Sequence, residues 1–269
     1  MTTEQRERPG KSKPETVLSL KGTFSAERSE AIRAVSGNRT AGDRYLSRTD
    51  LFYESIAVVF KVVEHRLLRG QIPIHAKQIW NLPDRIPAGV AFRVETKSVD
   101  RSKDAPNAMI IIDVTFYGEG DQELATGRTM LAFSETMSLE PKRSDPTTLG
   151  ELLGKPMAVT ERLIDDYAEA SGDKNIVHVN SAVARGLGLK DRLLHGVCSD
   201  DIALGLAGPR DGRHEKAGDV GKTETLFGAP VYPGDTLSTY RNGHAVTVVN
   251  QRSEVVLTRT EKFNPDLLP

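Results

Sequence analysis

Two stretches of this 269-residue chain resemble each other, and this repetition limits the possible fold more than any other feature. Residues 26–39 (AERSEAIRAVSGNR) align without a gap with residues 161–174 (ERLIDDYAEASGDK), so that Gly37 matches Gly172, 135 positions later. The two halves of the chain also share one order of predicted elements, which is helix, helix and then strands. This order predicts a duplicated α+β unit.

The first half contains two predicted helices and three predicted strands. One helix begins after Ser25, a favourable N-cap residue, and ends at a Ser-Gly-Asn sequence. Residues 51–70 are predicted to form a long, mostly buried helix because of their length and the terminating glycine, although their β-branched content favours a strand. Three segments rich in β-branched and aromatic residues are predicted strands: 89–99, 108–118 and 123–135.

The second half follows a polar segment with two prolines, residues 138–148, which we interpret as a linker. A helix is expected over 157–173, with Thr160 as its N-cap, and another from about Val197 to Ala207. Four strands are expected after them, at 224–233, 235–243, 245–251 and 254–263. We therefore expect a disordered leader over 1–16, an N-terminal unit over 17–137 and a C-terminal unit over 149–269.

The composition argues against several classes of function. The 36 basic and 37 acidic residues give a net charge of −1, without the basic excess that a nucleic-acid or anionic-membrane binder needs. The single cysteine, Cys198, can form neither an internal disulfide nor a cysteine-based metal site, which favours a reducing cytoplasm. No apolar run approaches the roughly 18 residues that span a bilayer, and the polar N-terminus lacks the apolar segment of a secretory signal.

Residues 167–196 hold the densest set of groups able to do chemistry. Asp173, Asn175 and His178 lie within six residues on a segment that reads as irregular, where reactive groups often occur. His195-Gly196 precedes a predicted helix, whose free backbone N–H groups can hold an oxyanion. An aspartate and a histidine five positions apart are also common in turns and in structural roles.

The same stretch resembles a known family. YAEASGDKNIVHVN is similar to the signature segment of the (R)-specific enoyl-CoA hydratases, the MaoC-like dehydratase family of the hotdog fold. The family's residues are kept at Tyr167, Ser171, Gly172, Asp173, Asn175 and His178, while Ile176 stands where proline is usual. The family's His-Gly pair corresponds to His195-Gly196, and its downstream strand-turn element corresponds to Phe227, Pro230, Val231, Gly234 and Asp235.

This resemblance implies a double hotdog, in which each unit is a curved antiparallel sheet wrapped around a long central helix. The first unit would be degenerate, because Asn38 and Asp43 stand at the positions equivalent to Asp173 and His178. The implied reaction is the reversible syn hydration of a trans-2-enoyl thioester, or dehydration of the (R)-3-hydroxyacyl thioester. The two units would form a pseudo-dimer within one chain, and a homodimer of whole chains is also plausible.

The resemblance also assigns roles to residues. Asp173 and His178 would hold one water molecule as the acid–base pair, Asn175 would orient them, and the Gly196 N–H would hold the thioester oxygen. We expect substrate contacts from His195, Val197, Asp200 and Arg192. No metal or cofactor is implied, since the substrate arrives on coenzyme A or on the phosphopantetheine arm of an acyl carrier protein. Its phosphates could meet basic residues of this region, although surface charge is the commoner role for each: Arg185, Lys190, Arg192, Arg210 and Arg213.

Asp200 and Asp201 depart from the family, which usually has apolar or small residues there. Because burying two unpaired carboxylates is costly, either this helix is more exposed than in relatives, or the two aspartates face a polar substrate or a basic partner. Of these, we favour a polar substrate, such as a polyketide or another oxygenated acyl chain. Two other functions stay open. One is hydrolysis of an acyl thioester, as in hotdog thioesterases. The other is a non-catalytic acyl-binding or partner subunit.

Overall fold

The computed structural model describes residues 16–38, 45–67, 72–82, 85–100, 108–134, 141–207 and 221–262. The leader expected over 1–16 lies outside this part of the chain except for Thr16, which begins the first strand. Asp43, Arg210 and Arg213 also lie outside it.

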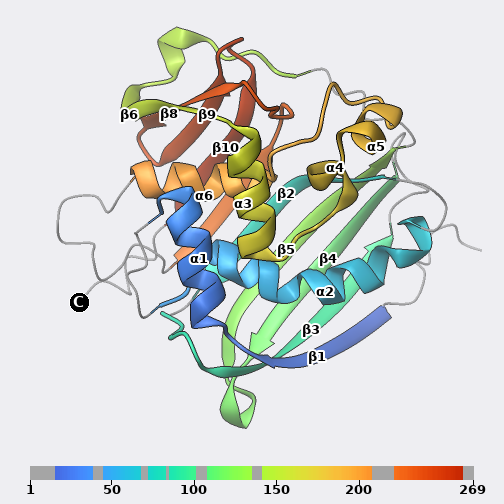
Figure 1. The fold of residues 1–269 in the computed structure, drawn as a ribbon. Helices are drawn as coiled ribbons and strands as arrows, with labels where there is room; N and C mark the ends of the chain where they lie inside the picture. Colours follow the sequence, from blue (N-terminus) through green and yellow to red (C-terminus); the bar gives the residue numbers. More distant parts are fainter. Residues whose placement is uncertain are drawn as a thin grey trace, which may run out of the picture.

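Ten strands form one antiparallel sheet in the described part of the chain (Figure 1). Those of the first half are β1 (Thr16–Thr23), β2 (Ile72–Leu82), β3 (Ala91–Asp100), β4 (Ala108–Tyr117) and β5 (Glu123–Ser134). Those of the second half are β6 (Glu151–Ala158), β7 (Gly221–Phe227), β8 (Thr236–Asn242), β9 (Ala245–Asn250) and β10 (Val255–Lys262). With its helices, the sheet confirms the expected α+β class.

The strand order is the same in the two halves when each is followed from its outer edge to the middle of the sheet. The first half runs β1, β3, β4, β5, β2, and the second runs β6, β8, β9, β10, β7. The halves meet where β2 pairs with β7, from Lys77 opposite Leu226 to Leu82 opposite Gly221. The repetition seen in the sequence therefore extends to the topology.

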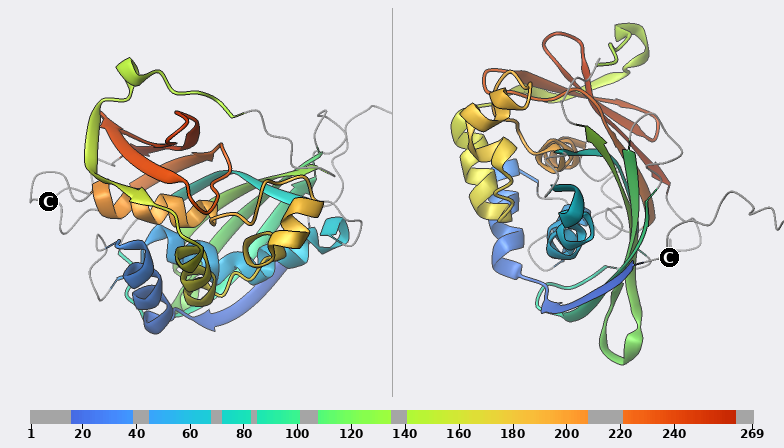
Figure 2. Two further views of the ribbon diagram at one scale, coloured as in Figure 1. Left: turned by 45° about the horizontal axis from the view of Figure 1, so that its top comes forward. Right: turned by 90° about the vertical axis from the view of Figure 1, so that its right-hand side faces the viewer.

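Six α-helices lie on one side of this sheet in the described residues. They are α1 (Ala26–Ser36), α2 (Arg48–Leu67), α3 (Glu161–Ser171), α4 (Ile176–Val179), α5 (Ser181–Gly186) and α6 (Gly196–Ala207). Figure 2 shows the sheet curving around α2 and α6, with α1 and α3 on their far side. The inner position suits α6, because apolar residues occur on all its faces.

The two aligned stretches of sequence form equivalent helices, α1 and α3, that pack against each other. The Ser25 side chain accepts a hydrogen bond from the Arg28 N–H at 3.1 Å, and Thr160 accepts one from the Leu163 N–H at 3.0 Å. Each helix ends at a glycine with a positive φ, which is 72° at Gly37 and 74° in its counterpart. The predicted caps and ends are thus confirmed.

Other boundaries differ from the predictions. The helix expected from residue 157 begins at Glu161, because Met157 and Ala158 belong to the edge strand β6. The helix expected over 51–70 already begins at Arg48. The strand expected over 224–233 ends at Phe227, where the chain turns and its next two N–H groups bond to the carbonyls of Val256 and Val255.

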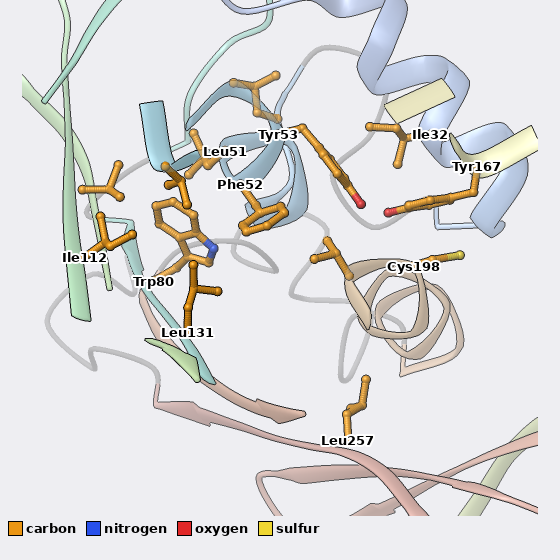
Figure 3. Close-up of a cluster of buried hydrophobic side chains, with 14 of the residues drawn as sticks. Ile32, Leu51, Phe52, Tyr53, Trp80, Ile112, Leu131, Tyr167, Cys198 and Leu257 are labelled. Carbon is orange, nitrogen blue, oxygen red and sulfur yellow. The ribbon is translucent and has the colours of Figure 1, made fainter. Parts of the chain in front are cut away.

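Both halves share one continuous hydrophobic core. It extends from Trp80 and Leu131 across α2 to Cys198 and Leu257 in the second half (Figure 3). Tyr53 of α2 and Tyr167 of α3 meet inside it with their hydroxyl groups directed toward each other. No helix in the described ranges has the length and apolar character that crossing a membrane requires.

Candidate active site

The segment that follows α3 fixes the carboxylate of Asp173. After the left-handed turn at Gly172, the Asp173 N–H donates to the Ser171 side chain at 3.2 Å. The Asn175 N–H then donates to Oδ1 of Asp173 at 3.1 Å. Asp173 is half-buried, and the hydrogen bond from the Asn175 N–H holds its carboxylate in place.

Asn175 also starts the short helix that carries His178, so the irregular segment expected here was wrong for residues 176–179. Its side chain caps α4 by accepting from the Val177 N–H at 3.4 Å. Ile176 occupies the first helical position and is 49% exposed. Proline is favoured at that position because a backbone N–H there has no carbonyl partner within the helix, so its loss costs no hydrogen bond. The departure from the family's proline therefore leaves the local geometry intact.

His178 and His195 are held by carbonyl groups of the backbone. Nδ1 of His178 donates to the Leu193 carbonyl at 2.9 Å, which leaves Nε2 with a lone pair. Nε2 of His195 donates to the Asp173 carbonyl at 2.9 Å. The two rings stack with centroids 3.8 Å apart and an angle of 24° between their planes.

Both imidazoles are neutral at pH 7. Burial lowers the pKa of His178, and the nearby Asp173 carboxylate opposes this only in part. Burial also lowers the pKa of His195 well below its usual value, and His178 lowers it further. A neutral His178 with a free Nε2 lone pair can accept a proton.

The three side chains Asp173, His178 and His195 offer ligand atoms within 4.8 Å of one another, a set of the kind that binds metals. A metal must lie near the plane of each imidazole that binds it. Because the two rings are stacked, their in-plane lone pairs run side by side and do not converge on one ion. The geometry therefore does not favour a metal bound by both histidines.

These groups open into a cavity of about 150 Å³ that both halves of the chain line. The second half contributes Asp173, Asn175, His178, His195, Gly196 and Val197. The first half contributes a mainly apolar wall that includes Phe52, Ile56, Val59, Phe60, His75 and Leu131. Helix α6 begins at the cavity, so its first N–H groups are available to a ligand. The structure thus brings six of the eight predicted site residues together.

Asp200 and Arg192, the other two, do not line this cavity, and their contact with substrate stays a prediction. Asp200 accepts a hydrogen bond from Thr225 at 3.1 Å and lies 3.5 Å from the Arg259 guanidinium. Arg192 forms a two-pronged ion pair with Asp165. Each charge is neutralised inside the protein, and the sequence alone does not reveal either partner.

Asp201 is fully buried and connects the two halves. It accepts hydrogen bonds from Thr49 at 2.5 Å, Asn38 at 3.1 Å and the Tyr167 hydroxyl at 2.7 Å. Burial raises the pKa of Asp201 to about 7. Asn38, at the position equivalent to Asp173, thus contacts a carboxylate as a structural residue.

The remaining motif residues have structural partners. Asp235 accepts from the Tyr232 N–H at 2.9 Å and pairs with Arg252 at 2.6 Å, so the Pro-Gly segment is a turn before β8, as expected. Arg185 pairs with Asp191 at 3.0 Å.

Sequence reasoning missed two polar residues of the cavity, His75 and Ser199. His75 stacks between Phe52 and Phe227, with centroids 5.0 and 4.4 Å away, and its Nε2 lies 3.1 Å from Oε1 of Gln78. Burial lowers the pKa of His75 to about 4. No motif marks either residue, because each reaches the cavity only through the packing of β2 or α6.

Comparison with known proteins shows how common this fold is. HtdX of Mycobacterium tuberculosis superposes with a TM-score of 0.72 at 18% identity, covering 91% of this chain and 98% of that one. An acyl-ACP thioesterase from Bacteroides thetaiotaomicron superposes with a TM-score of 0.61 at 11% identity, covering 92% and 98%. At these identities the likeness shows the fold alone.

One curated relative is similar in sequence. The fatty acid synthase beta subunit aflB of Emericella nidulans is 34% identical over 101 residues, which is 34% of this chain. The match spans only 4% of the length of that relative.

The curved sheet, the enclosed helices and the carboxylate–imidazole pair at the cavity are together typical of a hotdog-type protein. The family model described as a MaoC like domain matches residues 146–263. This part of the chain, which holds Asp173, His178 and Gly196, therefore belongs to the MaoC-like dehydratase family.

Proposed function

We propose that the protein is a hydro-lyase that reversibly hydrates trans-2-enoyl thioesters to (R)-3-hydroxyacyl thioesters. The observation that carries the proposal is the placement of Asp173 and His178 beside the start of α6 at one largely apolar cavity. Their ligand atoms are no more than 4.8 Å apart. One water molecule can bridge such a gap with two hydrogen bonds of about 2.8 Å each.

In hydration, this water attacks C3 of the enoyl thioester while the Asp173–His178 pair removes its proton. The pair delivers a proton to C2 on the same face, and dehydration reverses these steps through the same groups. The neutral state of His178 suits it to accept the proton. Asn175 supports the pair through its own N–H bond to Asp173 and its cap on the helix of His178.

Negative charge develops on the thioester oxygen as the enolate forms. The Gly196 N–H at the start of α6 would donate to this oxygen, and the positive end of the helix dipole favours the charge. His195 and Val197 form the wall beside it. No residue in this scheme requires a metal or an organic cofactor.

We further propose that the two halves are two hotdog units, the first over residues 17–137 and the second over 149–269. The shared strand order and the placement of α2 and α6 inside the sheet support this division. Within it, the first unit has no acid–base pair of its own among the described residues and instead supplies the apolar wall.

That wall favours an aliphatic acyl chain. The idea of an oxygenated or polyketide chain rested on Asp200 and Asp201, and both carboxylates have partners within the protein. The acyl group could arrive on coenzyme A or on a carrier protein. The similarity to a fatty acid synthase subunit supports delivery by a carrier protein.

The test is turnover of trans-2-enoyl and 3-hydroxyacyl thioesters on both carriers, followed by mass spectrometry. We expect interconversion, and a loss of about 10²- to 10⁴-fold in kcat for Asp173→Asn and for His178→Ala. Asp166→Asn and His244→Ala are matched controls on exposed residues and should keep the wild-type rate.

The same assay separates the other functions. Release of free thiol without interconversion of the two acyl species would identify a thioesterase, the activity named for one structural neighbour. Binding of acyl thioesters without turnover would identify a non-catalytic subunit. Full activity in both Asp173→Asn and His178→Ala would refute the site assignment.

A further inference from the structure

Ser199 places in the cavity wall a hydroxyl that none of the steps above uses. The residue is 1% exposed, lines the cavity, and its Oγ has no hydrogen-bond partner in the described part of the chain. A buried polar group left unpaired costs on the order of 1–3 kcal/mol. Such a group in a native protein requires an explanation, and a ligand that pairs with it is one.

General helix geometry predicts that this hydroxyl lies on the side of α6 that begins at Gly196. Ser199 follows Gly196 by three positions, and residues three apart share one face of a helix. Side chains in a helix lean toward its N-terminus, so the Ser199 side chain leans back over the turn that begins at Gly196. The Ser199 N–H donates to the His195 carbonyl at 3.3 Å, which makes it part of the helix, whereas the Gly196 N–H precedes the first helical bond.

We propose that the Ser199 hydroxyl donates a second hydrogen bond to the thioester oxygen, beside the Gly196 N–H. This role rests on the proposed hydratase function. Two neutral donors would share the charge of the enolate inside an apolar cavity, where each hydrogen bond is worth more than in water. Substrate binding would at the same time give the buried hydroxyl the partner that it lacks in the free protein.

A different role would act through His195. Nδ1 of His195 is also buried and has no hydrogen-bond partner among the described residues, and it belongs to the residue four positions before Ser199. A hydroxyl acting on that ring would change the proton affinity of the stacked His178 and His195 pair. A hydroxyl donating to the substrate oxygen would leave the pH profile unchanged, because serine does not titrate in this range.

The test compares Ser199→Ala and Ser199→Thr with the wild type on trans-2-butenoyl-coenzyme A. For Ser199→Ala we expect kcat to fall by about 10²-fold with little change in KM, since removing one such donor costs about 10²- to 10³-fold. Ser199→Thr keeps the hydroxyl and should recover most of the rate. The Tm of Ser199→Ala should be no lower than that of the wild type, because its Oγ makes no bond in the free protein.

Thr239 provides a matched control. Its Oγ1 is also buried without a partner, but it lies on β8 and does not line the cavity. Thr239→Val should therefore keep the wild-type kcat. A reduced rate in Ser199→Ala but not in Thr239→Val supports a direct role for Ser199.

Two results would overturn the proposal while leaving the hydratase function intact. One is a kcat for Ser199→Ala within about twofold of an active wild type. The other is a reduced kcat accompanied by a displaced pH profile, which would assign Ser199 to the histidine pair. A wild-type protein without hydratase activity would refute the proposed function itself, and this is seen before any variant is compared.

Discussion

Replacing Asp201 by asparagine should change how the stability of the protein depends on pH. Asp201 is fully buried, and its pKa is raised to about 7 from 3.8. Burial is the main cause, and the negative charge of Asp50 adds to it. Hydrogen bonds from Thr49, Tyr167 and Asn38 oppose the shift but do not cancel it.

The direction in which stability changes with pH follows from the protons bound by the folded and the unfolded chain. Between pH 3.8 and about 7, the folded protein keeps the Asp201 proton and the unfolded chain releases it. This carboxyl group therefore contributes most stability at low pH, and the contribution is lost as the pH rises through about 7. Each pH unit between the two pKa values changes the free energy of unfolding by about 1.4 kcal/mol. From pH 5 to pH 8 the wild type should lose about 3 kcal/mol through this one group.

Asparagine keeps the shape of the side chain but does not titrate. Its carbonyl oxygen can still accept from Thr49 and Asn38, and its amide group can donate to the Tyr167 oxygen. Urea denaturation of both proteins at pH 5 and pH 8 gives four free energies of unfolding. The change with pH should be smaller in Asp201→Asn by about 3 kcal/mol, because other groups titrate alike in the two proteins.

Asp166→Asn serves as the control, since Asp166 is exposed and its substitution should leave the pH dependence of unfolding unchanged. Equal pH dependence in the wild type and Asp201→Asn would refute the reasoning. It would mean that Asp201 is ionised in the folded protein at no cost.

Three further predictions concern the site and the scaffold. Because burial lowers the pKa of His178, the acid limb of the kcat/KM profile against pH should lie below pH 6.5. It should move lower still in Asp173→Asn, because the Asp173 carboxylate raises this pKa. An acid limb above pH 6.5 would contradict the prediction. His75→Ala removes a ring that contacts Phe52 and Phe227 and so enlarges the cavity. The kcat/KM for a longer enoyl thioester should therefore rise relative to that for a shorter one. An unchanged ratio would place the acyl chain elsewhere. Thr160→Ala should lower the free energy of unfolding in urea by about 1 kcal/mol through loss of the α3 cap, and Thr160→Ser should not.

Features set by neighbouring residues could be predicted from the sequence. Ser25 and Thr160 cap their helices through the backbone three positions on, so the chain itself contains both partners. The edge strand β6 could not be predicted in this way, because it contains Gly154 and Pro156, is mostly exposed, and has a shift of register between Leu153 and Met157. Its pairing with β8 depends on residues 78 to 90 positions away.

The candidate site also contains some residues placed by local hydrogen bonds and others placed by distant contacts. Asp173, Asn175 and His178 lie on one short segment, and their hydrogen bonds are local, so the motif predicts their placement. The partner of Asp200 could not be predicted in this way, because Arg259 is 59 positions away on β10. Ser199 was missed because only the packing of α6 within the fold shows that its hydroxyl is buried.

The join between β2 and β7 has a consequence for how such a chain evolves. Two identical copies meeting at this join would carry two equivalent sites, and any substitution would appear in both. In a single chain, each half can change alone. The position equivalent to Asp173 holds Asn38 in the first half, and this residue donates a hydrogen bond to Asp201 of the second half. A substitution at Asn38 should therefore change the contact between the two halves and the stability of the protein, and not the chemistry proposed for Asp173.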